Sequence, residues 1–237
     1  MGTNQLSKDN VQHMTKKFLE LATTLKENEG VERIQPKLEQ YKLGLFRLVV
    51  IGEIKKGKTR FINALLRKPD LLPVHSDVAT STVYKVMYGD VEKYKVFFLP
   101  KATNQAKENL TPLEIPREQL AEYGTEDGNP DNQKMVDFIG VQLPHPFLKS
   151  GLVIIDTPGL GGLFRKHSDI TWRYIPRADA IFFVLDSVEA VASQEEMECL
   201  QKLHEMTPRL FFVQTKTDIA GTEQWQQWRN EQFKRNK

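Results

Sequence analysis

The chain has 237 residues, of which 40% are hydrophobic and 9% aromatic, so it can bury the core of one large domain or of one domain with an appendage. Its 33 basic and 31 acidic residues give a formal net charge of +2. This composition lacks the strong basic excess that is typical of nucleic-acid-binding proteins, so we expect no nucleic-acid partner.

The sequence also indicates the redox environment of the protein and whether these residues attach to a membrane. Cys199 is the only cysteine, which excludes a disulfide framework or a cysteine metal cluster within these residues and favours a reducing, cytoplasmic setting. No apolar run reaches the length of a membrane-spanning helix, and the N-terminus lacks the apolar core of a secretory signal. Leu6 stands where a myristoylation signal has Ser or Thr, so we expect no lipid anchor.

Residues 7–29 are expected to form an amphipathic helix. Their apolar residues recur at intervals of three and four, as in a narrow coiled-coil stripe: Val11, Met14, Phe18, Leu21 and Leu25. Either this stripe packs on the chain's own domain, or it belongs to a bundle whose other helices lie outside this sequence. Pro36–Tyr41 is expected to form a second short helix, and we assign residues 1–44 to an N-terminal helical segment.

Four short apolar runs predict buried strands of a parallel sheet: Leu48–Ile51, Leu152–Ile155, Ile181–Leu185 and Leu210–Val213. Helical patterns separate most of them: Thr59–Leu66, Asp169–Arg173 and Gln194–Glu205. This alternation predicts an α/β fold with a doubly wound, mostly parallel sheet.

The stretch between residues 80 and 145 has a different pattern. Three segments alternate apolar and polar residues and predict antiparallel strands that extend one edge of the sheet: Ser81–Tyr88, Lys93–Leu99 and Met135–Leu143. The polar stretch 101–134 is expected to form loops around one short helix.

Residues Gly52–Thr59 fit the phosphate-loop pattern G-x-x-x-x-G-K-[ST], between an apolar strand and an amphipathic helix. The backbone N–H groups of such a loop surround a β-phosphate, and Gly57 permits the close approach. Lys58 is expected to reach the β- and γ-phosphates, while the Thr59 hydroxyl binds Mg²⁺. Lys55, Lys56 and Arg60 complete the predicted nucleotide-binding residues of this segment.

A second motif, Asp-Thr-Pro-Gly, ends the predicted strand Leu152–Ile155. Asp156 at such a strand end can hold Mg²⁺, usually through water, and the N–H of Gly159 can bind the γ-phosphate. Alternatively the motif is only a turn, for which its residues are well suited. The phosphate loop favours the metal interpretation, because the two motifs would then bind one ion.

The third motif is Thr-Lys-Thr-Asp at residues 215–218. The Asp218 carboxylate can accept the ring N–H and the exocyclic amine of guanine, a donor pair that adenine lacks, and the aliphatic stem of Lys216 can cover the base. Alone this motif is weak, and a solvated loop is its alternative. The order of all three motifs favours GTP over ATP.

A magnesium-contacting threonine is expected between the first two motifs, in Val78–Thr82. We assign this role to Thr80, just before a predicted strand, where its hydroxyl could reach the ion and its N–H the γ-phosphate. Thr82 and Ser81 are the alternatives, and all three could instead be ordinary strand residues.

Together these motifs resemble the dynamin superfamily of large GTPases, and within it the bacterial dynamin-like proteins. The resemblance covers about residues 45–220 and rests on five segments: GEIKKGKT, LLPVHSDVATSTV, VIIDTPGLGG, AIFFVLD and TKTD. Lys58 and Asp156 lie 98 residues apart, which leaves room for the antiparallel sheet extension of dynamin-type domains. The predicted N-terminal helix is similar to the family's neck helix.

The resemblance implies a GTPase domain over residues 45–237 that forms a homodimer across its nucleotide face and couples hydrolysis of GTP to GDP with membrane remodelling. It implies a cytoplasmic protein whose membrane contacts, peripheral in the full-length protein, lie outside these residues. Ile219–Lys237 is expected to form a polar helix, and the resemblance implies a further strand and base-contacting loop beyond it. The domain is therefore predicted to be truncated at its C-terminus.

Two features of the site bear on catalysis. Leu160 follows Asp-Thr-Pro-Gly where Ras-type switches carry a water-orienting Gln, so we expect slow hydrolysis by the domain alone. Lys55 is expected to act near the β–γ bridge once a second domain closes over the site, which makes Lys55, Lys58 and Thr80 the predicted catalytic residues. The alternative is that Lys55 and Lys56 are solvated lysines that attract a triphosphate, and we prefer this interpretation for Lys56.

Three other functions remain open. A regulatory switch would bind GTP with negligible hydrolysis, and Leu160 keeps this alternative open. A ribosome-assembly GTPase is disfavoured by the near-neutral charge, since phosphate contacts supply much of the affinity for RNA. An ATPase is the last alternative, and competition between GDP and ADP for binding would distinguish it from a GTPase.

Overall fold

The computed structural model describes residues 8–25, 31, 34–35, 38, 42–74, 80–99, 111–160, 171–188, 194–206 and 209–220. The chain divides into two compact units, residues 1–46 and 47–237. The first contains α1 (Lys8–Thr24), which confirms a helix in the predicted place, and its apolar side chains Met14, Phe18 and Leu21 are exposed. Except for Leu38, the predicted helix Pro36–Tyr41 falls outside the described residues.

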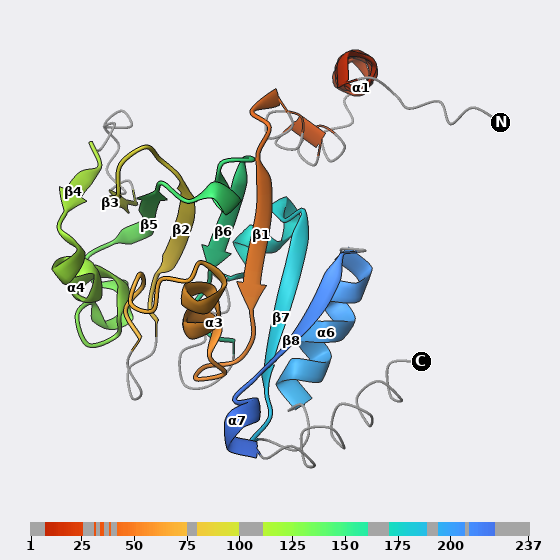
Figure 1. Cartoon of the computed structure of the whole chain (residues 1–237). Helices are drawn as coiled ribbons and strands as arrows, with labels where there is room; N and C mark the ends of the chain where they lie inside the picture. Colours follow the sequence, from red (N-terminus) through yellow and green to blue (C-terminus); the bar gives the residue numbers. More distant parts are fainter. Residues whose placement is uncertain are drawn as a thin grey trace. The chain divides into compact units, whose positions relative to one another are not determined.

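The second unit is built on an eight-stranded sheet with the order β4-β3-β5-β2-β6-β1-β7-β8 (Figure 1). The strands are β1 (Phe46–Ile51), β2 (Val83–Tyr88), β3 (Lys93–Phe98), β4 (Leu113–Ile115), β5 (Val136–Leu143), β6 (Leu152–Asp156), β7 (Ala180–Asp186) and β8 (Leu210–Thr215). The mixed α/β fold predicted from the sequence is confirmed.

The three strands β1, β7 and β8 form a parallel part of the sheet. β1 pairs in parallel with β7, and β7 with β8. Val49, Val50 and Ile51 of β1 have no exposed surface, as is typical of strands that are covered on both faces. All four predicted buried strands are present, with ends one or two residues longer. β8 is the exception in burial, because Phe211 and Phe212 are about half exposed at the edge of the sheet.

The sheet extension differs from the prediction in two respects. β2 is antiparallel to β6, and β3 is antiparallel to both β4 and β5, but β2 pairs with β5 in parallel. The chain reaches β5 through β3, β4 and α4 (Leu120–Gly124), a connection long enough to return in the same direction. The loops predicted for 101–134 also contain β4, whose three residues are too few to produce an alternating pattern.

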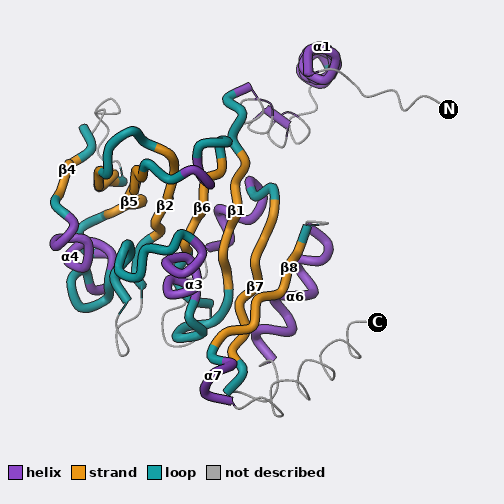
Figure 2. Tube along the Cα trace, viewed as in Figure 1, coloured by secondary structure: helices purple, strands orange, loops and turns teal. Residues whose placement is uncertain are grey.

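The helices of the second unit alternate with the parallel strands (Figure 2). α3 (Lys58–Leu65) lies against β6, α6 (Gln194–Met206) precedes β8, and α7 (Thr217–Ala220) follows it. The predicted helices at 59–66 and 194–205 are confirmed, whereas that at 169–173 begins outside the described residues. Short 3₁₀ turns complete the elements: η1 (Arg117–Gln119), η2 (Pro130–Asn132), η3 (Pro146–Leu148) and η4 (Ile175–Arg177).

No helix among the described residues combines the length and the apolar character needed to cross a bilayer. The predicted polar helix within Ile219–Lys237 lies outside the described residues beyond Ala220.

Asn63 fixes the loop that leaves α3. Its side chain is 1% exposed, and its Nδ2 donates to the carbonyls of Pro69 and Leu72, each at 2.9 Å. Its Oδ1 accepts from the N–H of Leu72 at 3.0 Å. These bonds replace the missing backbone partners of a buried loop and set the path of the chain toward Pro73 and Val74.

Replacement Asn63→Leu should therefore lower the free energy of unfolding by about 2–4 kcal/mol, because buried backbone groups lose their partners. Urea denaturation followed by circular dichroism measures the change. Gln201→Leu, at an exposed position of α6, is the control and should change the value by less than about 0.5 kcal/mol. Equal effects of the two substitutions would contradict the role of Asn63.

Candidate functional site

The segment between β1 and α3 forms a loop with three left-handed residues. Gly52, Lys55 and Gly57 have φ angles of 149°, 64° and 88°. A Cβ on Gly52 would lie 2.4 Å from the carbonyl oxygen of Val184, so no other residue fits there. Gly57 is the residue before α3, where its left-handed conformation turns the chain into the helix.

The side chain of Lys58 bonds back to the start of this loop. Its Nζ donates to the carbonyls of Gly52 at 3.1 Å and Glu53 at 2.8 Å, and the residue is 6% exposed. Burial lowers the pKa of Lys58 to about 8, although the nearby carboxylates of Asp156 and Glu53 oppose this shift. The lysine therefore remains mostly charged at neutral pH, in a loop whose shape suits an anion.

Asp156, at the end of β6, faces the start of α3. Its Oδ2 accepts a hydrogen bond of 2.7 Å from the Thr59 hydroxyl, and the residue has no exposed surface. Among the described residues its other oxygen, Oδ1, has no hydrogen-bond partner. Burial raises the pKa of Asp156 to about 6, against the opposing effects of Thr59 and Lys58.

A buried carboxylate with an unpaired oxygen beside a threonine hydroxyl is an oxygen donor set that suits Mg²⁺. A cation there would offset the burial cost of the carboxylate and give Oδ1 a partner. Thr59 and Asp156 therefore fit the magnesium ion that the sequence predicts.

The chain after β6 lies directly on the phosphate loop. The N–H of Leu160 donates to the Gly52 carbonyl at 3.0 Å, and Leu160 forms an isolated bridge with Glu53. A Cβ on Gly159 would lie 2.6 Å from the backbone nitrogen of Ile54, so a side chain there would displace the loop. Leu160 itself is buried, at 7% exposure.

The end of β8 is attached to the same loop. The Thr215 hydroxyl donates to the Lys56 carbonyl at 2.6 Å. Lys216 follows with a φ of 55°, and its Nζ donates to Asp186 Oδ2 at 2.9 Å. Asp186 ends β7 and was not identified from the sequence, because a single acidic residue after an apolar run resembles any strand terminus. Asp218 is exposed at the start of α7.

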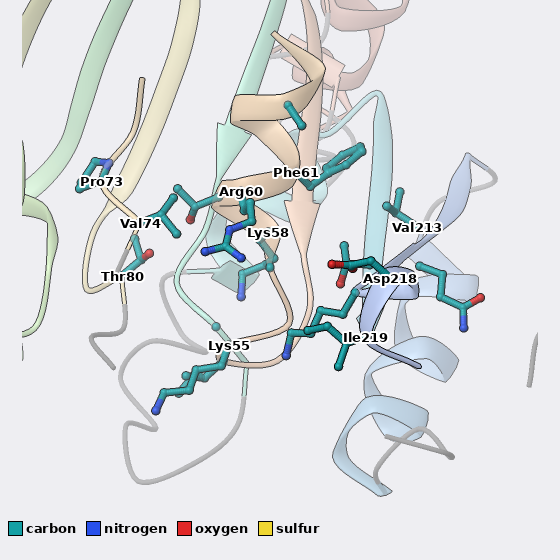
Figure 3. Close-up of a pocket in the computed structure, with 18 residues that line it drawn as sticks. Lys55, Lys58, Arg60, Phe61, Pro73, Val74, Thr80, Val213, Asp218 and Ile219 are labelled. Carbon is teal, nitrogen blue, oxygen red and sulfur yellow. The ribbon is translucent and has the colours of Figure 1, made fainter. Parts of the chain in front are cut away.

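One cavity of about 690 Å³ joins these parts. In Figure 3, Asp218 and Ile219 lie on one side, Thr80 and Val74 on the other, and Lys58 between them. Of the predicted site residues, the wall contains Lys55, Gly57, Lys58, Thr59, Arg60, Thr80, Gly159, Lys216 and Asp218. Gly52, Lys56 and Asp156 are not part of the wall, and Asp156 is connected to it through Thr59.

The interpretation of Lys56 as a solvated lysine is wrong. The residue is 3% exposed, and its Nζ lies 3.7 Å from Glu53 Oε2 and 3.8 Å from Glu196 Oε1. Lys55, by contrast, is exposed. The left-handed turn at Lys55 separates the directions of these two side chains, and neither this turn nor the distant partner Glu196 can be identified from the local sequence pattern.

Of the three candidates for the metal-contacting residue, Thr80 alone lies in the cavity wall. It is partly exposed and bridges Thr125 in an antiparallel pair. Ser81 and Thr82 are buried, and their hydroxyls have no hydrogen-bond partner among the described residues. The metal contact of Thr80 stays a prediction.

Comparison with known proteins identifies the family of the chain. Residues 48–217 match the Dynamin family. An uncharacterised protein in the xynA 3' region of Caldicellulosiruptor sp. is 34% identical over 214 residues, which are 90% of this chain and 50% of that protein. The isoniazid-induced protein IniA of Mycobacterium tuberculosis is 30% identical over 175 residues, 73% of this chain and 26% of its own length.

More distant relatives show the same domain. The bacterial dynamin-like protein of Nostoc punctiforme is 29% identical over 150 residues, 60% of this chain and 20% of that protein. A solved structure described as an oligomerised bacterial dynamin pair superposes with a TM-score of 0.61 at 20% identity, over 96% of this chain and 42% of its own. The chain thus spans half or less of these relatives. It belongs to the Dynamin family.

Proposed function

We propose that this domain binds magnesium-bound GTP and hydrolyses it to GDP and phosphate. The observation that carries the proposal is the convergence of Lys58, the Thr59–Asp156 pair and Asp218 on one cavity. Lys58 and the N–H groups of its loop hold the β- and γ-phosphates, and Thr59, Asp156 and Thr80 hold the magnesium ion. The ion supplies positive charge that offsets the charge on the phosphate oxygens.

Base selection is assigned to the end of β8. Asp218 accepts the two adjacent donors of guanine, and the aliphatic stem of Lys216 covers the base. The ion pair with Asp186 holds the Lys216 ammonium at 2.9 Å, which limits the rotamers of that stem. Adenine lacks the donor pair, so a carboxylate at this position selects GTP over ATP.

The second half of the proposal is that hydrolysis is stimulated when two such domains meet and is coupled to membrane remodelling by parts of the protein outside these residues. Leu160 is buried and bonded to the phosphate loop, so its side chain cannot orient water. Lys55 is exposed at the cavity, where a second copy could fix it near the β–γ bridge. A solved relative of the same fold is described as an oligomerised pair that tethers membranes.

A regulatory switch with negligible hydrolysis is the second candidate function. The buried Leu160 favours it, because the described part of the cavity wall offers no amide or carboxylate side chain other than Gln214 and Asp218, which lie toward the base. The two functions differ in how turnover depends on protein concentration.

For a dimerisation-stimulated GTPase, the turnover rate per molecule should rise with protein concentration, and Lys55→Ala should lower the stimulated rate by about 100-fold, as for other preorganised charges. Phosphate release measured across a concentration series tests this. Lys68→Ala, at an exposed lysine outside the cavity, should behave as the wild type. A constant rate per molecule would favour the switch, and full activity of Lys55→Ala would exclude a catalytic role for Lys55.

The base-binding role predicts a change of specificity in Asp218→Asn. An amide offers one donor and one acceptor, so GDP affinity should fall by about 100-fold while XDP, which has a carbonyl in place of the exocyclic amine, should bind more tightly. Competition against a fluorescent nucleotide measures both affinities. Asp127→Asn, at an exposed aspartate away from the cavity, is the matched control. Unchanged GDP affinity would contradict the assignment of Asp218.

A further inference from the structure

The side chain of Lys56 is buried and does not line the cavity. Lys56 is 3% exposed and Glu196 is 1% exposed, and lysine and glutamate are rarely buried to this extent unless they are paired. Lys56 Nζ lies 3.7 Å from Glu53 Oε2, within the same loop, and 3.8 Å from Glu196 Oε1. Glu196 belongs to the first turn of α6, so the pair joins two elements that are distant in sequence.

The backbone of Lys56 is fixed from another direction. Its carbonyl accepts the 2.6 Å hydrogen bond from the Thr215 hydroxyl, at the end of β8. Lys56 is therefore attached to α6 through its side chain and to β8 through its main chain. It directly follows Lys55, whose φ of 64° is costly for a residue with a side chain and needs support from its surroundings.

The same charges act on Lys58. Burial is the main cause that lowers the pKa of Lys58; the carboxylates of Glu53 and Glu196 oppose this shift, and the charge of Lys56 adds to it. Two carboxylates close to a polyphosphate site would repel the ligand. The ammonium of Lys56 offsets this negative charge without occupying the cavity.

We propose that Lys56 is a positioning residue that latches the phosphate loop to α6 through its buried ion pair with Glu196, and so keeps the loop in the shape that receives a polyphosphate. The Lys56 side chain does not touch the nucleotide, since it is absent from the cavity wall. The effect on nucleotides rests on the proposed function, whereas the latch itself does not.

The latch is tested without nucleotide by hydrogen–deuterium exchange of residues 53–57 and 196–200. Lys56→Met and Glu196→Gln should each speed exchange in both segments by about tenfold or more, because each substitution removes one member of the buried ion pair that joins the two segments. Lys56→Arg should restore slow exchange. Lys68→Met, which removes an exposed ion pair of 2.8 Å with Glu92, is the control and should leave both segments unchanged.

The double variant Lys56→Met/Glu196→Gln separates a latch from independent packing. If the two side chains act on each other, its exchange rate should be no faster than that of the worse single variant, whereas independent roles would multiply the two effects. Multiplied effects, or unchanged exchange in either single variant, would overturn the proposal. Should Lys56→Met fail to fold, Glu196→Gln and Lys56→Arg still decide the matter by the same readout.

Measurements of nucleotide affinity and turnover test whether the latch affects nucleotide binding. Lys56→Met should raise the dissociation constants of GDP and GTP by a similar factor of about ten and leave kcat within about twofold, since a loop that must be reordered weakens both complexes. A lowered kcat with unchanged dissociation constants would overturn the positioning role. If the wild type bound no guanine nucleotide, the proposed function would fail, while the exchange experiment would still decide the latch.

Discussion

The hydrogen bond from Thr59 to Asp156 is the contact on which the site depends. It joins the first turn of α3 to the end of β6 and turns one carboxylate oxygen toward the hydroxyl, at 2.7 Å. The other oxygen is buried without a partner among the described residues, and burial raises the pKa of the carboxyl to about 6. A buried carboxylate oxygen without a hydrogen-bond partner costs free energy, and a bound cation would offset that cost.

Parallel topology explains why the parts of the site meet. β1, β7 and β8 run parallel, so the loops that follow them leave the same edge of the sheet, where open α/β folds place their ligands. β1 leads into the phosphate loop, β7 ends at Asp186 and β8 ends at Thr215, which bonds to that loop. The close approach of Gly159 to Ile54 holds the segment after β6 against the same loop.

The lysines of the phosphate loop lie in different environments. Lys58 contributes to the cavity wall, whereas Lys56 is absent from it and is buried against Glu53 and Glu196. Lys55 remains exposed. Three lysines within four positions thus take three different environments, in a loop where Lys55 and Gly57 have left-handed conformations.

Much of this arrangement can be predicted from the sequence, because it depends on local patterns. The buried strands follow from apolar runs, and the phosphate loop follows from the spacing of Gly52, Gly57 and Lys58. What could not be predicted depends on contacts between distant residues. The Lys56–Glu196 pair, the Lys216–Asp186 pair and the parallel pairing of β2 with β5 all join segments whose adjacency no local pattern specifies.

The central claim is that these strand ends form one site for a magnesium-bound guanine nucleotide. Calorimetric titration of the protein with GDP, in the presence of Mg²⁺ and again with the metal chelated, tests it most directly, with ADP as the competing ligand. The account predicts saturable binding of GDP at one site per chain, weaker binding after chelation and no comparable binding of ADP. Absence of GDP binding, or equal binding of ADP, would contradict it.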